Sequence, residues 1–487
     1  SILLSITTNN HALGFRFASY NYNTIPHHMA TATKIHLSAP TDTGVYSSGV
    51  REDAARAASE VLQEDMAAHH VFFNDEGFHN HIVHQILSIY ALGAGPAEIK
   101  AAYKRNASYQ RPVLPTDANL VQAMRDTATF MQCFGKEENY PNFLAFFQQE
   151  IDAKGVGDVL KEYVFKGDER AESMLSRLYA GLIHPLIHLG FGLEFNQPAI
   201  VAQALSQAAV HDDWIGRAFF LPAEKVANST ATPGQKSLLE ILGEIREDKA
   251  LTESVQWGDA NKIRDGVLAR APEQMLNYAA QYRVAGDRMN EALADMINTV
   301  GEYYLFVVVK PMDSDRDQQV YYTSTAQRPT KEIRIDFFYI HCVNSTIFFS
   351  KIIDLPFLDQ AAKVRMLEWK GRLDLLVYVS RGAPDLLRNE VTNYPAKDDW
   401  GTVFSRSIAH PSDDGHLAKL ARAVAHGQRV CQPFESPQKM PISGDMWLKI
   451  GNMAVDSTIA EGERSMWIRS TGFDEAWARF KGRANNL

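Results

Sequence analysis

The sequence is poor in cysteine, in clustered positive charge and in long apolar runs, and each shortage excludes a class of protein. Three cysteines in 487 residues, Cys133, Cys342 and Cys431, lie far apart, which argues against a disulfide framework, a zinc ribbon and an iron–sulfur cluster. This usage fits a reducing compartment, and we expect a cytoplasmic protein. No run reaches the roughly 18–20 apolar residues that a membrane span requires, so we expect no membrane partner.

Positive charge is also scarce. The net charge is −9 and no lysine or arginine run occurs, which argues against a nucleic-acid partner. A dinucleotide site of the Rossmann type would show Gly-x-Gly-x-x-Gly between a strand and a helix. Gly93-Ala-Gly95 and Gly190-Phe-Gly192 carry only the first two glycines and lie in helical surroundings. The sequence contains no P-loop and no Gly-x-Ser-x-Gly elbow.

Apolar residues recur every three or four positions over much of the chain, which predicts amphipathic helices. The segments with this pattern are 51–66, 118–134, 156–195, 199–211, 236–248 and 272–305. Glycine and proline predict loops at 93–96, 111–115 and 231–234. We therefore predict an all-α, mainly helical fold, with one large domain over residues 29–487 whose helices pack around a buried metal and substrate site.

Three segments depart from this pattern. Residues 1–28 contain no acidic residue and little periodicity, and we expect a poorly structured N-terminal extension, with a weak targeting leader as the alternative. Residues 303–310 are compatible with a strand or with the end of a buried helix. Residues 311–330 are polar and rich in charge, which predicts a surface loop or lid.

Five of the sixteen histidines lie in segments that are too apolar to face water. Two form a pair three residues apart, two form a pair four residues apart, and one stands alone. A spacing of three or four places both rings of a pair on one side of a helix. The five residues are His81, His84, His184, His188 and His341.

A buried imidazole without partners costs about 1–3 kcal/mol per polar group. One shared metal ion would satisfy several of these rings together, so we predict that the five histidines are metal ligands. The alternative is that each ring hydrogen-bonds its own carbonyl. Imidazole nitrogen suits iron, copper and zinc alike. On this reasoning His79 points away from His81 and is a weaker candidate, and His211 is a reserve ligand or acid–base group.

Lys370 lies in an apolar segment beside Trp369. Burial lowers the pKa of a lysine, and the neutral amine can act as a base or react with carbon dioxide to give a carbamate that binds metal. We therefore add Lys370 to the candidate ligands; the alternative is a surface ion pair with Glu368 or Asp374. Three further carboxylates, Glu194, Asp336 and Asp374, are candidates for orienting the histidines.

Several aromatic side chains accompany these segments. They are candidates for lining a planar substrate pocket, although aromatic residues of core helices more often fill the core. They are Phe337, Phe338, Tyr339, Phe348 and Trp369. Proline 185 lies directly after His184 and either kinks or starts its helix.

Four dispersed blocks resemble the questin oxidase family, which includes Baeyer–Villiger-type and ring-opening oxidases of fungal aromatic polyketide pathways. The blocks are Phe78-His-Asn-His-Ile-Val-His84 with Tyr90-Ala-Leu-Gly-Ala94, His184-Pro-Leu-Ile-His-Leu-Gly-Phe-Gly-Leu-Glu-Phe195, Asp336-Phe-Phe-Tyr-Ile-His341 and Glu368-Trp-Lys-Gly-Arg-Leu-Asp374. The resemblance implies oxidative cleavage of an anthraquinone or reduced anthraquinone ring, so the expected partner is a small aromatic polyketide.

Three functions follow for testing. The first is a non-heme Fe(II) oxygenase that uses O2 to cleave a carbon–carbon bond, with His81, His184, His341 and Lys370 as its catalytic residues. The second is a metal-free Baeyer–Villiger-type monooxygenase that uses NADPH and employs the histidines as acids and bases. The third is a helical protein that binds an aromatic ligand without catalysis.

Overall fold

The fold is mainly helical, as predicted. The computed structural model describes residues 29–229, 236–298, 319–435, 440, 442–459 and 466–483. Within these ranges, strand-like pairing is limited to isolated bridges such as Phe72 with His79. A search of the same ranges found no helix with the length and apolar character needed to cross a bilayer. The predictions for 1–28, 231–234 and 303–310 fall outside the described residues.

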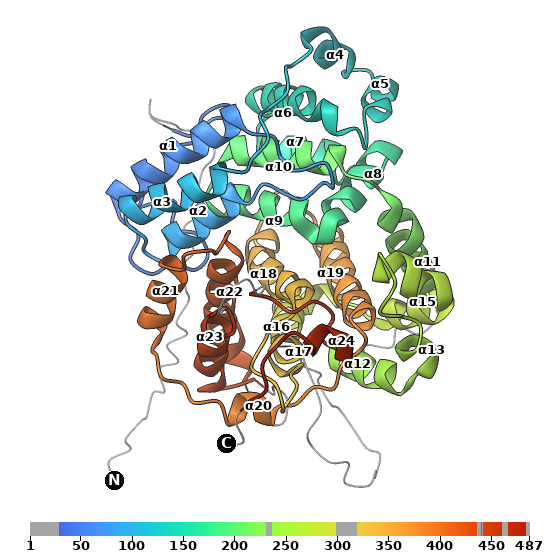
Figure 1. Cartoon of the computed structure of the whole chain (residues 1–487). Coiled ribbons are helices and arrows are strands. Elements are labelled where there is room, and N and C mark those ends of the chain that lie inside the picture. Colours follow the sequence, from blue (N-terminus) through green and yellow to red (C-terminus); the bar gives the residue numbers. More distant parts are fainter. Residues whose placement is uncertain are drawn as a thin grey trace, which may run out of the picture.

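In the first half of the chain, the helices up to residue 210 cover the upper part of the molecule, and the helices that follow, up to residue 247, continue down its right side to the lower part (Figure 1). They are α1 (Glu52–Ala68), α2 (Ile82–Ala91), α3 (Pro96–Ala107), α4 (Ala118–Ala123), α5 (Thr127–Gln132), η1 (Glu137–Asn139), α6 (Tyr140–Lys154), α7 (Val156–Tyr163), α8 (Glu169–Leu178), α9 (Ala180–Glu194), α10 (Pro198–Val210), η2 (Gly216–Phe220), α11 (Leu221–Ser229) and α12 (Leu238–Glu247).

The second half contains the longest helix and the helices that close the lower part of the molecule. They are α13 (Lys249–Thr252), η3 (Lys262–Val267), α14 (Leu268–Arg270), α15 (Pro272–Gln281), η4 (Gly286–Arg288), α16 (Met289–Asn298), α17 (Gln319–Thr325), α18 (Phe337–Ile352), α19 (Gln360–Ser380), α20 (Asn389–Thr392), α21 (Trp400–Ile408), α22 (His416–Cys431), η5 (Gln432–Phe434), α23 (Met446–Ser457) and α24 (Asp474–Trp477).

The longer predicted segments are divided into separate helices by capping residues. Segment 118–134 becomes α4 and α5, because the Asp126 carboxylate accepts from the Thr129 N–H at 2.9 Å and starts a new helix. Segment 156–195 becomes α7, α8 and α9, with Asp168 capping α8 through the Ala171 N–H at 2.9 Å. Apolar periodicity continues across these breaks because all the pieces face one core.

The surface loop predicted over residues 311–330 is wrong for residues 319–325, which form helix α17. Tyr322 of this helix is fully buried, and its ring packs on Tyr339 and Tyr378, with centroid distances of 4.6 and 5.7 Å. Residues 326–330 do form a loop, which is exposed at Pro329 and Thr330. Charged neighbours made the whole segment look solvated, whereas these aromatic contacts hold α17 inside the molecule.

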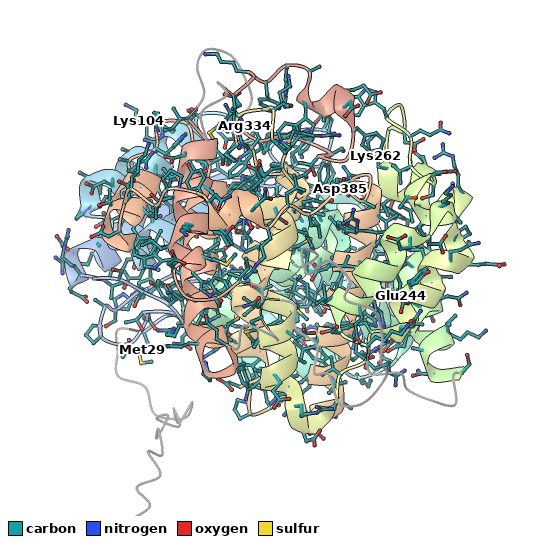
Figure 2. The ribbon with its side chains drawn as sticks, turned by 90° about the horizontal axis from the view of Figure 1, so that it is seen from below. Met29, Lys104, Glu244, Lys262, Arg334 and Asp385 are labelled. Atoms are coloured by element: carbon teal, nitrogen blue, oxygen red, sulfur yellow. The ribbon has the colours of Figure 1, made fainter. Side chains whose placement is uncertain are left out.

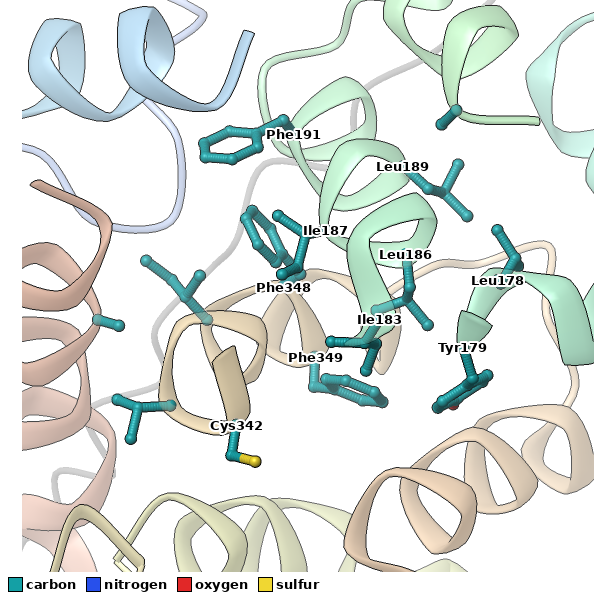
Figure 3. Packing of buried hydrophobic residues seen from close by; sticks show 14 of the residues in the cluster. Leu178, Tyr179, Ile183, Leu186, Ile187, Leu189, Phe191, Cys342, Phe348 and Phe349 are labelled. Atoms are coloured by element: carbon teal, nitrogen blue, oxygen red, sulfur yellow. The ribbon is translucent and has the colours of Figure 1, made fainter. Parts of the chain in front are cut away.

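Four helices enclose the centre of the molecule. Helix α2 packs on α9, α9 on α18, α18 on α22, and α22 on α2 again, so the four form a closed ring. Ile183, Ile187 and Phe191 of α9 face Phe348 and Phe349 of α18 (Figure 3). Many charged side chains lie on the outside, as Lys104 and Glu244 do on opposite sides of the molecule (Figure 2). Side chains that point inward from the four helices therefore meet in one interior.

The start of α9 is a strained turn. Gly181, Leu182 and Ile183 have left-handed backbone, with φ of 52°, 57° and 64°. This conformation costs about 1–3 kcal/mol for a residue other than glycine, and such strain concentrates at functional sites. The regular helix begins after it, so Pro185 lies in a first turn and starts the helix rather than kinking it.

Substitution of Gly190 by alanine should destabilise the fold. A Cβ atom at Gly190 would overlap the Phe348 ring where α9 meets α18, and such overpacking costs about 1–3 kcal/mol. Urea unfolding followed by circular dichroism measures the loss.

Gly243→Ala in α12 is the matched control. No heavy atom lies within 4 Å of the added Cβ there, so this variant should be neutral or slightly more stable. Equal stability of the two variants would contradict the close approach of α9 and α18.

Candidate metal centre

Histidines from five parts of the chain meet inside the ring of α2, α9, α18 and α22. Three precede or begin α2, two lie on α9, one follows α10, one lies on α18 and one starts α22. All of them are buried except the one after α10, which is partly buried. They are His79, His81, His84, His184, His188, His211, His341 and His416.

The closest approaches join Nε2 atoms. His81 Nε2 lies 3.0 Å from His184 Nε2, and His416 Nε2 lies 3.2 Å from His341 Nε2. One nitrogen from each of His81, His184 and His416 also lies within 4.8 Å of the other two. Neighbouring rings contact one another, with centroids of His184 and His341 at 4.8 Å. His81, His184 and His416 therefore converge from three separate elements, and His341 joins them through its contacts with His416 and His184.

Backbone carbonyls determine where two of these rings carry their hydrogen. His184 Nδ1 lies 2.7 Å from the Gly181 oxygen, and His341 Nδ1 lies 2.7 Å from the Phe337 oxygen. A carbonyl oxygen only accepts, so Nδ1 must donate in both rings. Each Nε2 then bears a lone pair.

The Asp414 carboxylate likewise determines that His81 and His416 carry their hydrogen on Nδ1. Its oxygens accept from His416 Nδ1 at 2.6 Å and from His81 Nδ1 at 3.2 Å. Burial acts to raise the pKa of Asp414, but its bonds to His416 and His81 outweigh this and hold the pKa well below its usual value. The side chain is 36% exposed, and partial solvation also favours its ionised form.

The Nε2 lone pairs are suited to a cation. Two neutral imidazoles that both carry hydrogen on Nδ1 cannot hydrogen-bond through Nε2, so a proton shared between the rings or a metal ion would each satisfy the contacts of 3.0 and 3.2 Å. Two nitrogens bound to one ion at about 2.1 Å, and separated by about 90–110°, lie about 3.0–3.4 Å apart. A protein carboxylate or carbonyl on Nδ1 is the usual support for a metal-bound histidine.

Burial keeps these rings neutral at pH 7. It is the largest cause that lowers the pKa of His81 to about 4, and it lowers the pKa of His184 and His341 well below 6.5. Neighbouring histidines and Lys419 add to this effect. Neutral rings are the form that binds a metal.

His84 and His188 lie next to this group, beside Lys419 of α22. The Lys419 amine is 3.4 Å from His84 Nδ1, and burial lowers its pKa to about 8. His84 Nε2 is buried and has no hydrogen-bond partner among the described residues. The His188 ring lies 5.3 Å from His84 and beside Gln203, but it makes no hydrogen bond of standard geometry within the described ranges.

Lys370, in contrast, lies in a separate buried ion pair. Its amine donates to both oxygens of Asp374, and both side chains are fully buried. The ion pair with Asp374 was the alternative interpretation, but the pair is buried rather than at the surface. None of the described contacts of Lys370 is with a histidine, so its role as a ligand stays a prediction.

The other predicted carboxylates have structural partners. Glu194 forms a buried ion pair with Arg422, whose Nη1 lies 3.0 Å from Oε2. Asp336 accepts from the N–H groups of Phe338 and Thr471 at 2.8 and 2.9 Å and caps α18. The described contacts of Glu194 and Asp336 are therefore with groups other than the histidines.

His79 and His211 belong to the cluster as a second pair. The His79 ring stacks on His184 at 4.0 Å and 7°, and His79 Nε2 lies 2.7 Å from His211 Nε2. The helical reasoning that weakened His79 does not apply, because α2 begins at Ile82 and His79 precedes it.

Sequence reasoning missed Asp414, His416 and Lys419. Asp413-Asp414-Gly415 precedes the helix and gives the segment a solvated appearance. Gly415 has φ of 106°, and a Cβ there would lie 2.8 Å from the Gln85 backbone, so this turn lies directly on α2. The available signal was the spacing of His416 and Lys419, three residues apart on one face of an amphipathic helix.

A cavity of about 470 Å³ adjoins the cluster. Gly181 lines it, and the position of an added Gly181 Cβ would lie 2.6 Å from His211 Cε1 and 2.9 Å from His79 Cε1. Phe338 lines it too, while the neighbouring Phe337 ring contacts His341 at 4.9 Å. The other lining residues are Tyr179, Leu182, Trp214, Ile215, Trp257, Asp259, Ala260, Asn261, Lys262, Ile263, Leu373, Arg381, Arg469 and Ser470.

Of the five aromatic residues predicted to line a pocket, Phe338 lines this cavity. Phe337 packs on the histidines. Phe348 packs on Phe191 at 4.7 Å, and Trp369 stacks on Phe220 at 4.8 Å. Tyr339 lies in the aromatic group with Tyr322. These last three residues fill the core, which was the alternative interpretation.

Comparison with known proteins gives consistent matches. The sequence profile of the questin oxidase-like family matches residues 78–424, a span that contains all eight clustered histidines and Lys419. A Baeyer-Villiger oxidase of Pestalotiopsis fici is 39% identical over 430 residues, which cover 86% of this chain and 92% of that protein. The questin oxidase of Aspergillus terreus is 38% identical over 458 residues, covering 92% and 98%. That of Aspergillus fumigatus is 34% identical over 460 residues, covering 92% and 99%.

The buried histidines should make the protein sensitive to mild acid. An unfolded histidine takes up a proton below about pH 6.5, whereas His81 and His188 stay neutral until about pH 4. The free energy of unfolding should therefore be unaffected by these groups above pH 6.5. It should fall by about 1.4 kcal/mol per histidine for each pH unit below that.

Urea unfolding at pH 7, 6 and 5 measures this slope. His188→Gln removes one neutral ring. The slope of the free energy of unfolding against pH should therefore decrease by the contribution of one histidine. A midpoint that is the same at pH 7 and pH 5 would contradict the neutral cluster.

Proposed function

The chain belongs to the questin oxidase-like family of oxidoreductases, and on that premise we propose that it is a non-heme iron oxygenase that uses O2 to cleave a ring of an anthraquinone-type substrate. The substrate class is carried over from the relatives named questin oxidase. The observation that supports the metal is the buried group of His81, His184 and His416, whose nitrogens lie within 4.8 Å of one another, with His341 beside His416.

The proposed ligands are His81, His184, His341 and His416. Three of the five predicted histidines, His81, His184 and His341, are kept, and His416 is added from its position. His84 and His188 are left out of the proposed set; their rings contact each other, and His84 contacts Lys419. Bound iron would supply the activation of dioxygen, which spin rules make slow with organic substrates alone.

The protein's own groups hold this centre in place. Gly181 and Phe337 fix two rings through their carbonyl oxygens, and Asp414 fixes the other two. The surrounding helices exclude water, which protects reactive species from side reactions. The adjoining cavity would hold the planar substrate against Trp214, Trp257 and Phe338.

Lys419 takes the role first assigned to Lys370. Its amine lies among the histidines, and with a pKa of about 8 a part of it is neutral near pH 7. A neutral amine can add carbon dioxide and lose a proton to give a carbamate, whose oxygens bind metal. We propose Lys419 as a fifth ligand in that form.

The Baeyer–Villiger names of several relatives favour a second candidate function. In it the enzyme needs no metal, takes two electrons from NADPH and inserts one oxygen atom beside a carbonyl. The histidines would then transfer protons to and from the substrate. The metal content of active protein separates the two candidates.

Elemental analysis tests the metal directly. Purified protein should contain iron near one equivalent, and it should consume oxygen when a reduced anthraquinone is added. His184→Ala should lose both the iron and the oxygen uptake. Asp414→Asn should weaken iron binding by about 10–100-fold, because it removes the acceptor that orients two rings.

His36→Ala is the control, since this partly buried histidine lies outside the cluster and should keep full iron content. Protein that is active with NADPH after removal of all metal would overturn the iron assignment and support the second candidate. Protein that never consumes oxygen would leave only ligand binding.

The two lysines should behave in opposite ways. Lys370→Met leaves the buried Asp374 carboxylate without this partner and should destabilise the fold by about 3–5 kcal/mol. Lys419→Met should lower the iron content at nearly unchanged stability. For the natural protein, removal of carbon dioxide should lower the activity and bicarbonate should restore it.

Urea unfolding and iron analysis of the two variants decide the assignment. Loss of iron in Lys370→Met with full iron in Lys419→Met would return the ligand role to Lys370.

A further inference from the structure

The cavity beside the histidine cluster carries more positive than negative charge. Lys262, Arg381 and Arg469 line it, and Asp259 is the carboxylate among the lining residues. Asp259 is held by Arg270 in a bidentate ion pair, with both distances between 2.7 and 2.8 Å. Its charge is therefore already balanced from outside the cavity, and the three cations determine the potential inside.

Two of the three cations have their own partners. Lys262 donates to the carbonyl oxygens of Gln256 and Trp257 at 3.0 and 2.5 Å. Arg381 donates to Ser470 Oγ at 3.3 Å and stacks over the Phe338 ring at 3.9 Å. The Asp336 carboxyl acts on Arg381 electrostatically. Both side chains are therefore parts of the cavity wall.

Arg469 is different. Its side chain is exposed, and it makes no hydrogen bond or ion pair with any residue that the structure describes. Its guanidinium lies 4.7 Å from the Phe337 ring centroid, and that ring contacts His416 at 5.1 Å. A cation with no ion-pair partner among the described residues therefore lies at the boundary between the cavity and the candidate metal centre.

We propose that Arg469 binds an ionised oxygen substituent of a planar aromatic substrate and so sets which edge of the ring system faces the histidines. This inference rests on the proposed function only in assigning the cavity to the substrate. A phenolate or a carboxylate would offer the same recognition chemistry, since guanidinium bonds either anion through charge-assisted hydrogen bonds. Arg469 is a specificity-determining residue in this proposal.

The shape of the cavity supports this choice of ligand. Trp214 and Trp257 line it together with Phe338, so aromatic faces are available for a flat ring system. Arg381 and Arg469 also repel each other, and this repulsion acts to lower the pKa of Arg381. A bound anion would relieve that repulsion. The cavity therefore complements a ligand that has a planar apolar ring system and one anionic oxygen.

The experiment measures binding rather than turnover. The probes are 2-hydroxyanthraquinone, its methyl ether 2-methoxyanthraquinone, and anthraquinone-2-carboxylate, each titrated into the full chain at a pH where the phenol is ionised. Quenching of tryptophan fluorescence reports binding, because two tryptophans line the cavity. Arg469→Gln should weaken the phenolate probe by about ten-fold or more, the usual effect of one charge-assisted bond.

The methyl ether should bind to Arg469→Gln and to the natural protein equally, within about two-fold, and Arg469→Lys should recover part of the lost affinity. The carboxylate probe shows which kind of anion is recognised. If Arg469→Gln weakens the binding of only one of the two anions, that anion is the ligand. Arg125→Gln is the matched control, an exposed arginine between α4 and α5 that bonds Gln122 and Glu150.

The proposal would be overturned if Arg469→Gln weakened the binding of the phenolate and of the methyl ether to the same extent, or if it weakened the binding of neither anion. Circular dichroism and urea unfolding verify that Arg469→Gln folds, which its lack of described bonds leads us to expect. Iron content and oxygen uptake are measured on the same samples. If binding depends on Arg469 but the protein contains no iron, this inference stands and the proposed oxygenase is rejected. If the protein contains iron and consumes oxygen but binding does not depend on Arg469, the proposed oxygenase stands and this inference is rejected.

Discussion

The organisation of this protein depends on where four imidazole rings carry their hydrogen atoms. Two carbonyl oxygens and one carboxylate accept from Nδ1, so the other nitrogen of each ring is left as a lone pair inside the core. Such lone pairs repel one another, and folding brings them together against that repulsion. The cation of the proposed function, held between these rings, would offset that repulsion. The strained start of α9 fits this view, because the carbonyl of Gly181 accepts from His184 there.

The helix ring explains how rings distant in sequence come together. Each of the four helices contributes histidines to the common interior while its other faces bury apolar side chains. The cavity shares two walls with this interior, at Gly181 and at the adjacent pair Phe337 and Phe338. Substrate recognition and oxygen chemistry are therefore assigned to neighbouring but distinct volumes, which lets the first vary without disturbing the second.

Much of the fold followed from the sequence, because apolar periodicity reports burial directly. The helical class and the participation of the histidines of α2, α9 and α18 were predicted from apolar surroundings. His416 and Lys419 were not, since acidic residues precede them and a linear pattern does not tell a solvated turn from one packed on another helix. The two buried lysines could not be told apart for a related reason. Lys370 and Lys419 are both buried, but only the three-dimensional structure distinguishes a lysine paired with Asp374 from one among histidines.

The Asp414 bridge has a consequence for biosynthesis. It joins His416, two residues away, to His81, which is 333 residues earlier in the chain. A growing polypeptide that has not yet reached α22 lacks this carboxylate and one of the four rings. Its early histidines are then not yet preorganised. Capture of the proposed ion would therefore be a late event that follows completion of the polypeptide, and the ion would stabilise finished molecules rather than fragments.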